Sequence, residues 1–325
     1  MIVSQVSLGY NYSEPRSACE GCELAIIRNF DPDDLAAYVR LINEIDALEK
    51  LGKASSVQHV RERLGEPGRH PHEDIFLAEE RGLLVGYAEL QCELGIGRAV
   101  LEGAVHPARR CQGVGSGLLE AAIERGREMG AEVVQAPIPE RMTVSRRFVE
   151  KRGFSLVRRH WRMGLTGYTG AAVPTLGGFE LRHFLPGDEE SLCALQNLTF
   201  ADHWGFCPNT AEEIRYLVNT SECHPEGILF LCGGEGKVAY CWTVDDAVDA
   251  AKAYVRMIGV DPAYRDRGLG EAVLVAALDY LTRRGVKNVE LLVDSTNTPA
   301  RRLYESLGFK REGVILWYEK RLVPD

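Results

Sequence analysis

The chain repeats itself once, at a separation of 155 residues. The segment 105–115 (VHPARRCQGVG) recurs as 260–270 (VDPAYRDRGLG), and the pair 153–154 (GF) recurs as 308–309 with no gap between. This period is that of whole domains, because solenoid repeats have periods of about 20 to 50 residues. The chain is therefore expected to contain two copies of one fold.

The repeat sets the predicted domain boundaries. The first copy is expected at 24–165 and the second at 179–325, with a Gly-, Thr- and Pro-containing linker at 166–178 between them. Residues 1–23 are expected to form an N-terminal tail. A chain of 325 residues is long enough for two domains of ordinary size.

Composition excludes several classes of function. The net charge of -9 argues against nucleic acid as a partner, because that affinity depends on Lys and Arg. No apolar run approaches the roughly 20 residues that span a bilayer, and no leader pattern opens the chain, so we expect a cytoplasmic protein with no membrane partner. The nine cysteines are scattered, and Cys19 and Cys22 have no second ligand pair, so no metal is predicted.

Hydrophobic periodicity predicts the same mixed α/β order in both copies. The first copy is expected to contain strand 24–28, helix 31–48, strands 74–78, 83–92 and 99–105, helix 114–129, strand 133–138, helix 144–152 and strand 156–163. The second is expected to contain strand 179–183, helix 189–199, strands 228–232, 238–244 and 254–260, helix 269–284, strand 289–293, helix 299–307 and strand 313–320. In each copy a Gly-rich loop lies between a strand and a helix.

That loop predicts an anion site. Glycines allow the backbone to approach a phosphate closely, and the N–H groups at the start of the helix point toward it. Neither copy completes the dinucleotide-binding G-x-G-x-x-G pattern or the G-x-x-x-x-G-K-[ST] phosphate loop. A helix cap with accidental glycines is the alternative, and the recurrence of the pattern argues against it.

The segments 260–270 and 297–309 (NTPARRLYESLGF) together resemble the two signature segments of the GCN5-related N-acetyltransferase (GNAT) superfamily. The resemblance covers nearly the whole chain, twice. It implies tandem α+β GNAT domains, each with a mixed, mostly antiparallel sheet flanked by helices. It also implies acetyl-CoA as co-substrate and an amine as acceptor.

The resemblance assigns cofactor contacts to both copies. In the second copy it implies that main-chain groups of the strand bind pantetheine and that the loop cradles the pyrophosphate. The residues implied there are Ile258, Gly259, Val260, Arg265, Asp266, Arg267, Gly268, Leu269, Gly270, Glu271, Asn297, Ala300 and Arg301. Those implied in the first copy are Gly103, Ala104, Val105, Cys111, Gln112, Gly113, Val114, Gly115 and Ser116.

Tyr304 occupies the family position of the general acid. A phenol suits protonation of a departing thiolate, because its pKa lies near that of a thiol. The repeat places Val149 at the corresponding position, so the second copy is expected to be catalytic and the first non-catalytic. A core tyrosine with no catalytic role is the alternative for Tyr304.

The general base is not assigned by the sequence. In the tandem family members that the chain resembles, it is a glutamate near the start of the pantetheine-binding strand, and this chain has Tyr254 there. The acidic residues Asp245, Asp246 and Asp249 precede that strand, and Glu102 lies on the corresponding strand of the first copy. A solvated acidic turn is the commoner explanation for three such aspartates.

The segment 202–206 (DHWGF) follows the first helix of the second copy, where the superfamily forms its acceptor wall. Asp202, His203 and Trp204 are therefore expected to contact substrate, with a capped turn as the alternative. The preferred function is direct acetyl transfer to the primary amine of a small molecule. An acyl-CoA sensor without turnover and a protein acetyltransferase acting on Lys or an N-terminus are the alternatives. The sequence is compatible with a monomer and with a homodimer.

Overall fold

The computed structural model describes residues 25–50, 52, 54–170, 177–234 and 236–322. The predicted tail at 1–23 lies outside these residues, as do Cys19 and Cys22. The chain forms two compact units. The C-terminal unit is Trp161–Glu312, and the N-terminal unit is the part described before Trp161 together with the part described after Glu312.

The N-terminal unit is a sheet in the order β1-β2-β3-β4-β5-β12. Among its described neighbouring strands, β4 and β5 run parallel, and the other pairs run antiparallel. Its elements are β1 (Ile26–Asn29), η1 (Pro32–Asp34), α1 (Leu35–Glu49), α2 (Val57–Leu64), α3 (Pro71–Asp74), β2 (Ile75–Glu80), β3 (Leu83–Glu93), η2 (Leu94–Ile96), β4 (Arg98–Val105), η3 (Pro107–Arg109), α4 (Val114–Glu128), β5 (Val133–Pro139), α5 (Thr143–Glu150), the first part of β6 (Ser155–Thr166) and most of β12 (Lys310–Arg321).

The C-terminal unit repeats this architecture in the strand order β6-β11-β10-β9-β8-β7. β10 and β11 are its parallel pair. Its elements are the end of β6, β7 (Glu180–His183), α6 (Glu189–Phe200), α7 (Ala211–Leu217), β8 (Cys223–Gly233), β9 (Gly236–Asp245), β10 (Lys252–Val260), η4 (Pro262–Tyr264), α8 (Leu269–Arg283), β11 (Asn288–Asp294) and α9 (Thr298–Ser306). The predicted fold class, a mixed and mostly antiparallel sheet flanked by helices in each copy, is confirmed.

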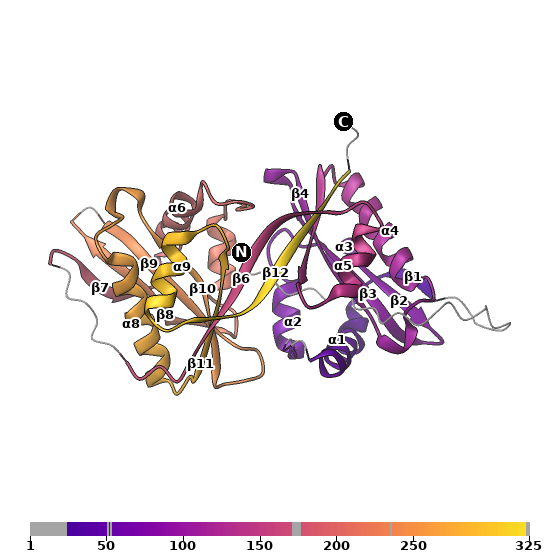
Figure 1. The fold of residues 1–325 in the computed structure, drawn as a ribbon, viewed down its shortest axis with the longest axis horizontal. Helices are drawn as coiled ribbons and strands as arrows, with labels where there is room; N and C mark the ends of the chain where they lie inside the picture. The colour runs from indigo at the N-terminus through magenta and orange to yellow at the C-terminus, as the bar shows by residue number, and fades with distance from the viewer. Residues whose placement is uncertain (1–24, 51, 53, 171–176, 235, 323–325) are drawn as a thin grey trace. The chain divides into compact units, whose positions relative to one another are not determined.

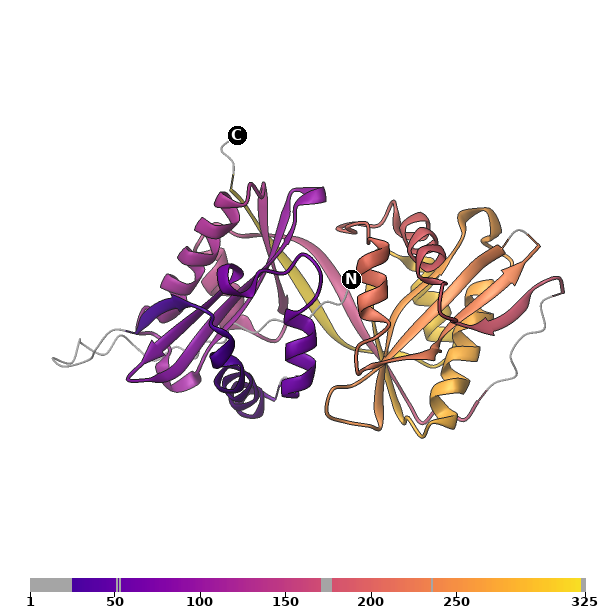
Figure 2. The ribbon, with the colours of Figure 1, turned by 180° about the vertical axis from the view of Figure 1, so that it is seen from behind.

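Helices cover both faces of each sheet. In the N-terminal unit α4 and α5 lie on one face (Figure 1), and α1 and α2 lie on the other (Figure 2). In the C-terminal unit α8 and α9 lie on one face, and α6 and α7 on the opposite face. Helix α8 packs tightly because Leu269, Val273 and Leu278 are among its many buried apolar residues.

The same ion pair fastens the first strand to the first helix in both copies. Arg28 binds both carboxylate oxygens of Asp34 at 2.6 and 2.8 Å, and Arg182 binds those of Asp188 at 2.6 and 2.9 Å. Such a bidentate pair fixes geometry as well as charge. The pairing holds the pKa of both carboxyl groups below the ordinary range of aspartate.

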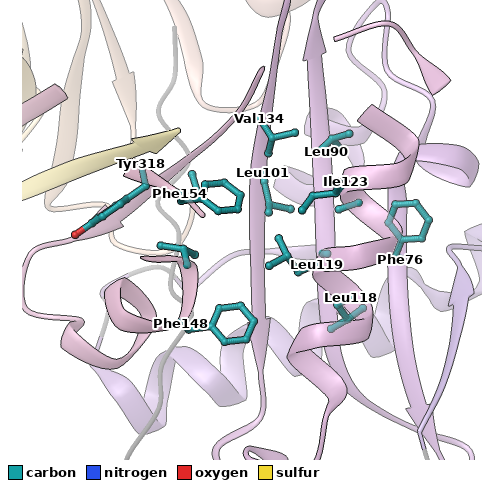
Figure 3. Packing of buried hydrophobic residues seen from close by; sticks show 14 of the residues in the cluster. Phe76, Leu90, Leu101, Leu118, Leu119, Ile123, Val134, Phe148, Phe154 and Tyr318 are labelled. Atoms are coloured by element: carbon teal, nitrogen blue, oxygen red, sulfur yellow. The ribbon is translucent and has the colours of Figure 1, made fainter. Parts of the chain in front are cut away.

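The last strand of each copy begins in its own unit and ends in the unit formed mostly by the other copy. β12, which ends the second copy, pairs antiparallel with β5, from Ile315 opposite Pro139 to Arg321 opposite Val133. Its Tyr318 joins the apolar core between the sheet and α4 (Figure 3). The compact units therefore differ from the sequence repeat, 24–165 and 179–325, at this strand.

A buried polar network holds β12 in the N-terminal unit. Arg98 of β4 donates to Gln135 of β5 (3.1 Å), and Gln135 donates to Glu319 of β12 (2.7 Å). The Arg98 guanidinium also lies 5.7 Å from the centre of the Trp317 ring. Because buried polar groups are costly without partners, this network favours β12 over a strand lacking these side chains.

Candidate active site

The two central parallel strands of the C-terminal unit pair over only part of their length. The register of β10 with β11 runs from Lys252 opposite Asn288 to Tyr254 opposite Glu290, although β10 continues to Val260. On its other side β10 stays paired with β9 as far as Val260, with an irregularity between Val255 and Met257. The edge of β10 facing β11 therefore has main-chain groups that no described strand pairs with beyond Tyr254.

The N-terminal unit has the same divergence. β4 pairs with β5 from Arg98 to Val100 and then continues to Val105. The predicted cofactor residues Gly103, Ala104 and Val105 lie on this continuation, as Ile258, Gly259 and Val260 lie on that of β10.

The Gly-rich loops have the same backbone conformation in both copies. Asp266 and Gly268 adopt φ values of 60° and 75°, and Cys111 and Gly113, at the corresponding positions, adopt 60° and 87°. This left-handed region favours glycine. Gly268 is the N-cap residue of α8 and Gly113 that of α4, and neither helix has a side-chain cap. The first-turn N–H groups, which include those of Leu269, Gly270 and Glu271, remain directed toward the loop.

Other predicted cofactor residues make contacts within the protein. The Arg265 guanidinium contacts the main-chain oxygens of Val260 and Thr199, both at 3.4 Å. The Asn297 side chain accepts from Ala300 N (3.2 Å) and caps α9. Arg301 donates to Ser295 O (2.9 Å) and stacks 3.7 Å from the centre of the Trp161 ring of β6.

The first helical turn differs between the copies. Arg152 donates to the Ser116 hydroxyl at 2.6 Å in the N-terminal unit, and Glu271 stands at the position that corresponds to Ser116. The remaining loop residues predicted to contact cofactor, Gln112, Val114, Gly115 and Arg267, lie in these two loops and helix starts. The structure thus brings together the predicted loop and strand residues of each copy.

Tyr304 lies in the core of the C-terminal unit on the α8 and α9 side of the sheet. Its side chain is 6% exposed and packs edge-on against Phe309, with ring centres 5.9 Å apart. Ile258 and Val260 of β10 pack against the same cluster. Burial, and secondarily the neighbouring Cys241, raises the pKa of Tyr304 above its ordinary value of 10.0. Val149, its counterpart by the repeat, is fully buried in the other core.

On the opposite face of β10, the C-terminal unit has a polar floor formed by Gln196, Thr199 and Tyr240. Tyr240 of β9 is directly opposite Gly259. A Cβ on Gly259 would lie 2.5 Å from Thr199 Oγ1 and 2.7 Å from Tyr240 Cε1. Gly259 is therefore needed because α6 and β9 approach the strand closely here.

In the N-terminal unit apolar side chains of α1 pack on the corresponding position of β4. Ala104 stands in the place of Gly259 and packs with Leu41 and Ile45 of α1. Tyr87 is opposite Ala104 as Tyr240 is opposite Gly259.

A buried ion cluster lies nearby in the N-terminal unit. Glu89, 4% exposed, accepts from Tyr38 (2.9 Å) and Arg69 (3.0 Å) and also pairs with Arg63. Burial alone would raise the pKa of Glu89, but the two arginines lower it from 4.5 to about 2. Glu102, a candidate base in the sequence, is directly opposite Glu89.

The segment containing Asp202, His203 and Trp204 is held against α6. Asn197 donates to Asn209 O and accepts from Asn209 N, both at 2.9 Å. The His203 ring lies 4.6 Å from that of Phe200. Partial burial and then the Arg265 charge lower the pKa of His203 below 6.5, while Asp294 and Asp202 act in the opposite direction. His203 therefore lies near the diverging ends of β10 and β11.

The three aspartates before β10 are engaged in local contacts. Asp246 accepts from the Tyr254 hydroxyl at 2.6 Å, and Asp245 pairs with Arg284 at 2.7 Å. Asp249 accepts from Ala251 N at 2.9 Å. Burial, followed by the hydrogen bond to Asp246, raises the pKa of Tyr254. Tyr254 thus stands where the strands diverge, paired with a carboxylate.

Sequence reasoning missed the polar floor. Gln196 and Thr199 fall on the same helical stripe as the buried Leu192 and Leu195, and that interruption of an apolar stripe was an available signal. Tyr240 lies in a run of strand residues with no distinguishing spacing.

Neither a metal site nor a membrane span is found within the described ranges. No three His, Cys, Asp or Glu side chains gather there as a metal would require. None of the helices in those ranges is both long enough and apolar enough to cross a bilayer.

The duplicated α+β fold, with a diverging strand pair and a Gly-rich loop in each copy, defines a tandem acyltransferase. The family model described as acetyltransferase (GNAT) family matches residues 42–154 and 190–309. The chain belongs to this family, and it is an acetyl-CoA-dependent N-acetyltransferase. Both the predicted family and the predicted enzyme class are confirmed.

The chain is similar over most of its length to relatives in sequence and in structure. The chain is 33% identical to a mycothiol acetyltransferase of Stackebrandtia nassauensis over 79% of this chain and 84% of that protein. It is 32% identical to one from Actinosynnema mirum over 86% and 94%. A GCN5-related N-acetyltransferase from Sphaerobacter thermophilus superposes with a TM-score of 0.74 at 26% identity, over 92% of this chain and 96% of that one. A tandem GNAT protein from the clavulanic acid pathway superposes with a TM-score of 0.73 at 17% identity, over 93% and 99%.

Proposed function

We propose that the C-terminal unit transfers an acetyl group from acetyl-CoA directly to the primary amine of a small molecule, with Tyr304 as the general acid. The observation that carries the proposal is the position of Tyr304, buried in the cluster against which Ile258 and Val260 of the diverging strand pack. The N-terminal unit has Val149 at that position.

Acetyl-CoA would be held by backbone groups of the C-terminal unit. The unpaired edge of β10 at 258–260 would bind the pantetheine amides, and the N–H groups of the loop and the first turn of α8 would bind the pyrophosphate. The corresponding backbone of the N-terminal unit would bind a second molecule without turning it over.

Transfer needs two proton movements. The amine nitrogen forms a bond to the carbonyl carbon, the C–S bond breaks, and the departing thiolate takes the proton of the Tyr304 hydroxyl. The high pKa of buried Tyr304 keeps that proton in place until the thiolate forms. His203, whose lowered pKa favours the neutral form, would accept, directly or through water, the proton that the attacking nitrogen loses as the amide forms. His203 then releases that proton to solvent, and Tyr304 regains its proton from solvent.

Only the names of the relatives suggest which amine is the acceptor. Because they are mycothiol acetyltransferases, the first amine to test is the mycothiol precursor that lacks the acetyl group. Tyr254, in place of the glutamate base expected by resemblance, is the reason to include other small amines and lysine peptides.

A thiol-release assay tests the proposal. With the best acceptor, Tyr304→Phe is expected to lower kcat by about 100-fold or more while acetyl-CoA still binds. Tyr280→Phe, which removes a phenol from the part of α8 remote from the loop, serves as the matched control. Equal rates for wild type and Tyr304→Phe would exclude the acid role. Binding without thiol release from any amine would favour a sensor, and release with peptides alone would favour a protein acetyltransferase.

A further inference from the structure

The polar floor beneath β10 contains donors that the protein leaves unused. The Gln196 and Tyr240 side chains are both 0% exposed. Within the part of the chain that the structure describes, Gln196 Nε2 has no hydrogen-bond partner, and the Tyr240 hydroxyl meets only Thr199, in a contact outside ordinary hydrogen-bond geometry. Buried polar groups in folded proteins normally have partners, so these two donors indicate a bound group that supplies an acceptor.

The neighbouring contacts define which atoms remain available. Gln196 Oε1 accepts from Asn209 Nδ2 at 3.2 Å, so the amide oxygen is occupied and Nε2 is the free end. The Thr199 hydroxyl donates to the Gln196 main-chain oxygen at 3.2 Å. What remains is one amide N–H pair and one phenol, both donors.

The Tyr240 hydroxyl reaches the strand that would bind pantetheine. The ring atom nearest to Gly259 is Cε1, which is bonded to the hydroxyl-bearing carbon, so the hydroxyl end of the ring lies at β10. Burial is the main cause that raises the pKa of Tyr240; Thr199 acts in the opposite direction, and Cys241 and Tyr304 add to the increase. The two phenols therefore approach the same stretch of β10 from opposite faces of the sheet.

We propose that the Tyr240 hydroxyl and Gln196 Nε2 donate hydrogen bonds to the carbonyl oxygen of the acyl group, on the side of β10 opposite Tyr304. This inference rests on the proposed function. When the amine nitrogen bonds to the carbonyl carbon, the electron pair of the C=O bond moves onto that oxygen. When the pair returns, the C–S bond breaks and the sulfur takes the Tyr304 proton. Fixed donors aimed at the oxygen lower the barrier because they need no reorganisation.

On the corresponding surface of the N-terminal unit the phenol is retained, but apolar side chains of α1 pack where α6 has Gln196 and Thr199. Ile45 and Leu41 of α1 pack against Ala104, and the one phenol in the corresponding place is Tyr87. The polar floor is therefore a property of the copy that retains Tyr304.

Isotope-edited infrared spectroscopy tests the assignment without requiring turnover. The full chain would be mixed with acetyl-CoA carrying ¹³C at the thioester carbonyl, and the carbonyl stretching frequency measured. A carbonyl that accepts hydrogen bonds absorbs at lower frequency. The frequency is expected to be lower in wild type than in Tyr240→Phe, which retains the ring that packs on Gly259. Gln196→Met is also expected to raise the frequency, and Tyr280→Phe, which removes a phenol from the part of α8 remote from the loop, is the matched control that leaves it unchanged.

Kinetics give a second measurement. Tyr240→Phe is expected to lower kcat by about 100-fold, the effect typical of losing one such donor, with the Kd of acetyl-CoA nearly unchanged. A loss confined to acetyl-CoA affinity would overturn the proposal, as would equal frequencies in wild type and both variants. A lowered frequency with no turnover of any amine would contradict the proposed function and support this assignment. Failure of acetyl-CoA to bind would overturn both.

Discussion

The two copies share a backbone and differ in the side chains that face it. Both have a parallel strand pair that diverges and a loop with left-handed residues at corresponding positions. Around β10 there are a buried phenol on one face and three polar side chains on the other, whereas β4 has Val149 on one face and Leu41 and Ile45 on the other. A cofactor site built from main-chain groups is kept when side chains are substituted. The side chains that would transfer protons are lost when they are substituted.

The ion cluster of the N-terminal unit provides the largest expected difference in stability. Glu89→Gln is expected to lower the free energy of unfolding of that unit by about 3 kcal/mol at neutral pH, because Arg63 and Arg69 remain buried without their counter-charge. Denaturant unfolding measures this loss, with Glu79→Gln, which removes a partly exposed partner of Arg28, as the control.

The pH dependence of this effect has a definite sign. The pKa of Glu89 falls from 4.5 to about 2 on folding, so its contribution is present above pH 4.5 and disappears as the pH falls toward 2. The difference between wild type and Glu89→Gln is expected to shrink over that interval. A difference that stays constant down to pH 2 would show that the charge of Glu89 does not stabilise the unit.

His203 distinguishes the copies through activity rather than stability. His203→Gln is expected to lower kcat/KM by about 100-fold at neutral pH. Because the pKa of His203 lies below 6.5 and the neutral form is the base, activity should rise with pH through that lowered value, and the variant should lose this limb. His183→Gln, which changes an exposed histidine of β7, is the control. If the activity of His203→Gln still rises with pH over the same interval, Tyr254 and Asp246 become the candidates for the general base.

Substitutions at Gly259 and at its counterpart Ala104 test the role of the polar floor. Gly259→Ala is expected to destabilise the C-terminal unit by about 1–3 kcal/mol and to lower activity, because its Cβ would collide with Thr199 and Tyr240. Ala104→Gly removes a methyl group from an apolar contact and is expected to cost about 1 kcal/mol in the N-terminal unit. Thermal unfolding and the acetyl-transfer rate measure both variants. Equal losses of rate in the two would show that the floors are functionally alike.

The sequence alone determined the duplication, the fold class and the position of the Gly-rich loops. These depend on local spacing, since the glycines and the helix that follows them are adjacent in the chain. Local periodicity also predicted most strands, but it assigned no helix where α2 and α7 occur, because both are short amphipathic segments of eight and seven residues.

Only the tertiary structure decided two further features. β12 pairs with β5 across more than 170 positions of sequence, and the network of Arg98, Gln135 and Glu319 that holds it there has no local pattern. The floor joins Gln196, Tyr240 and Gly259 from one helix and two strands. Periodicity reports which side of its own element a residue faces, but the partner it meets there depends on how distant elements pack. That packing is what separates the copy with a polar floor from the copy without one.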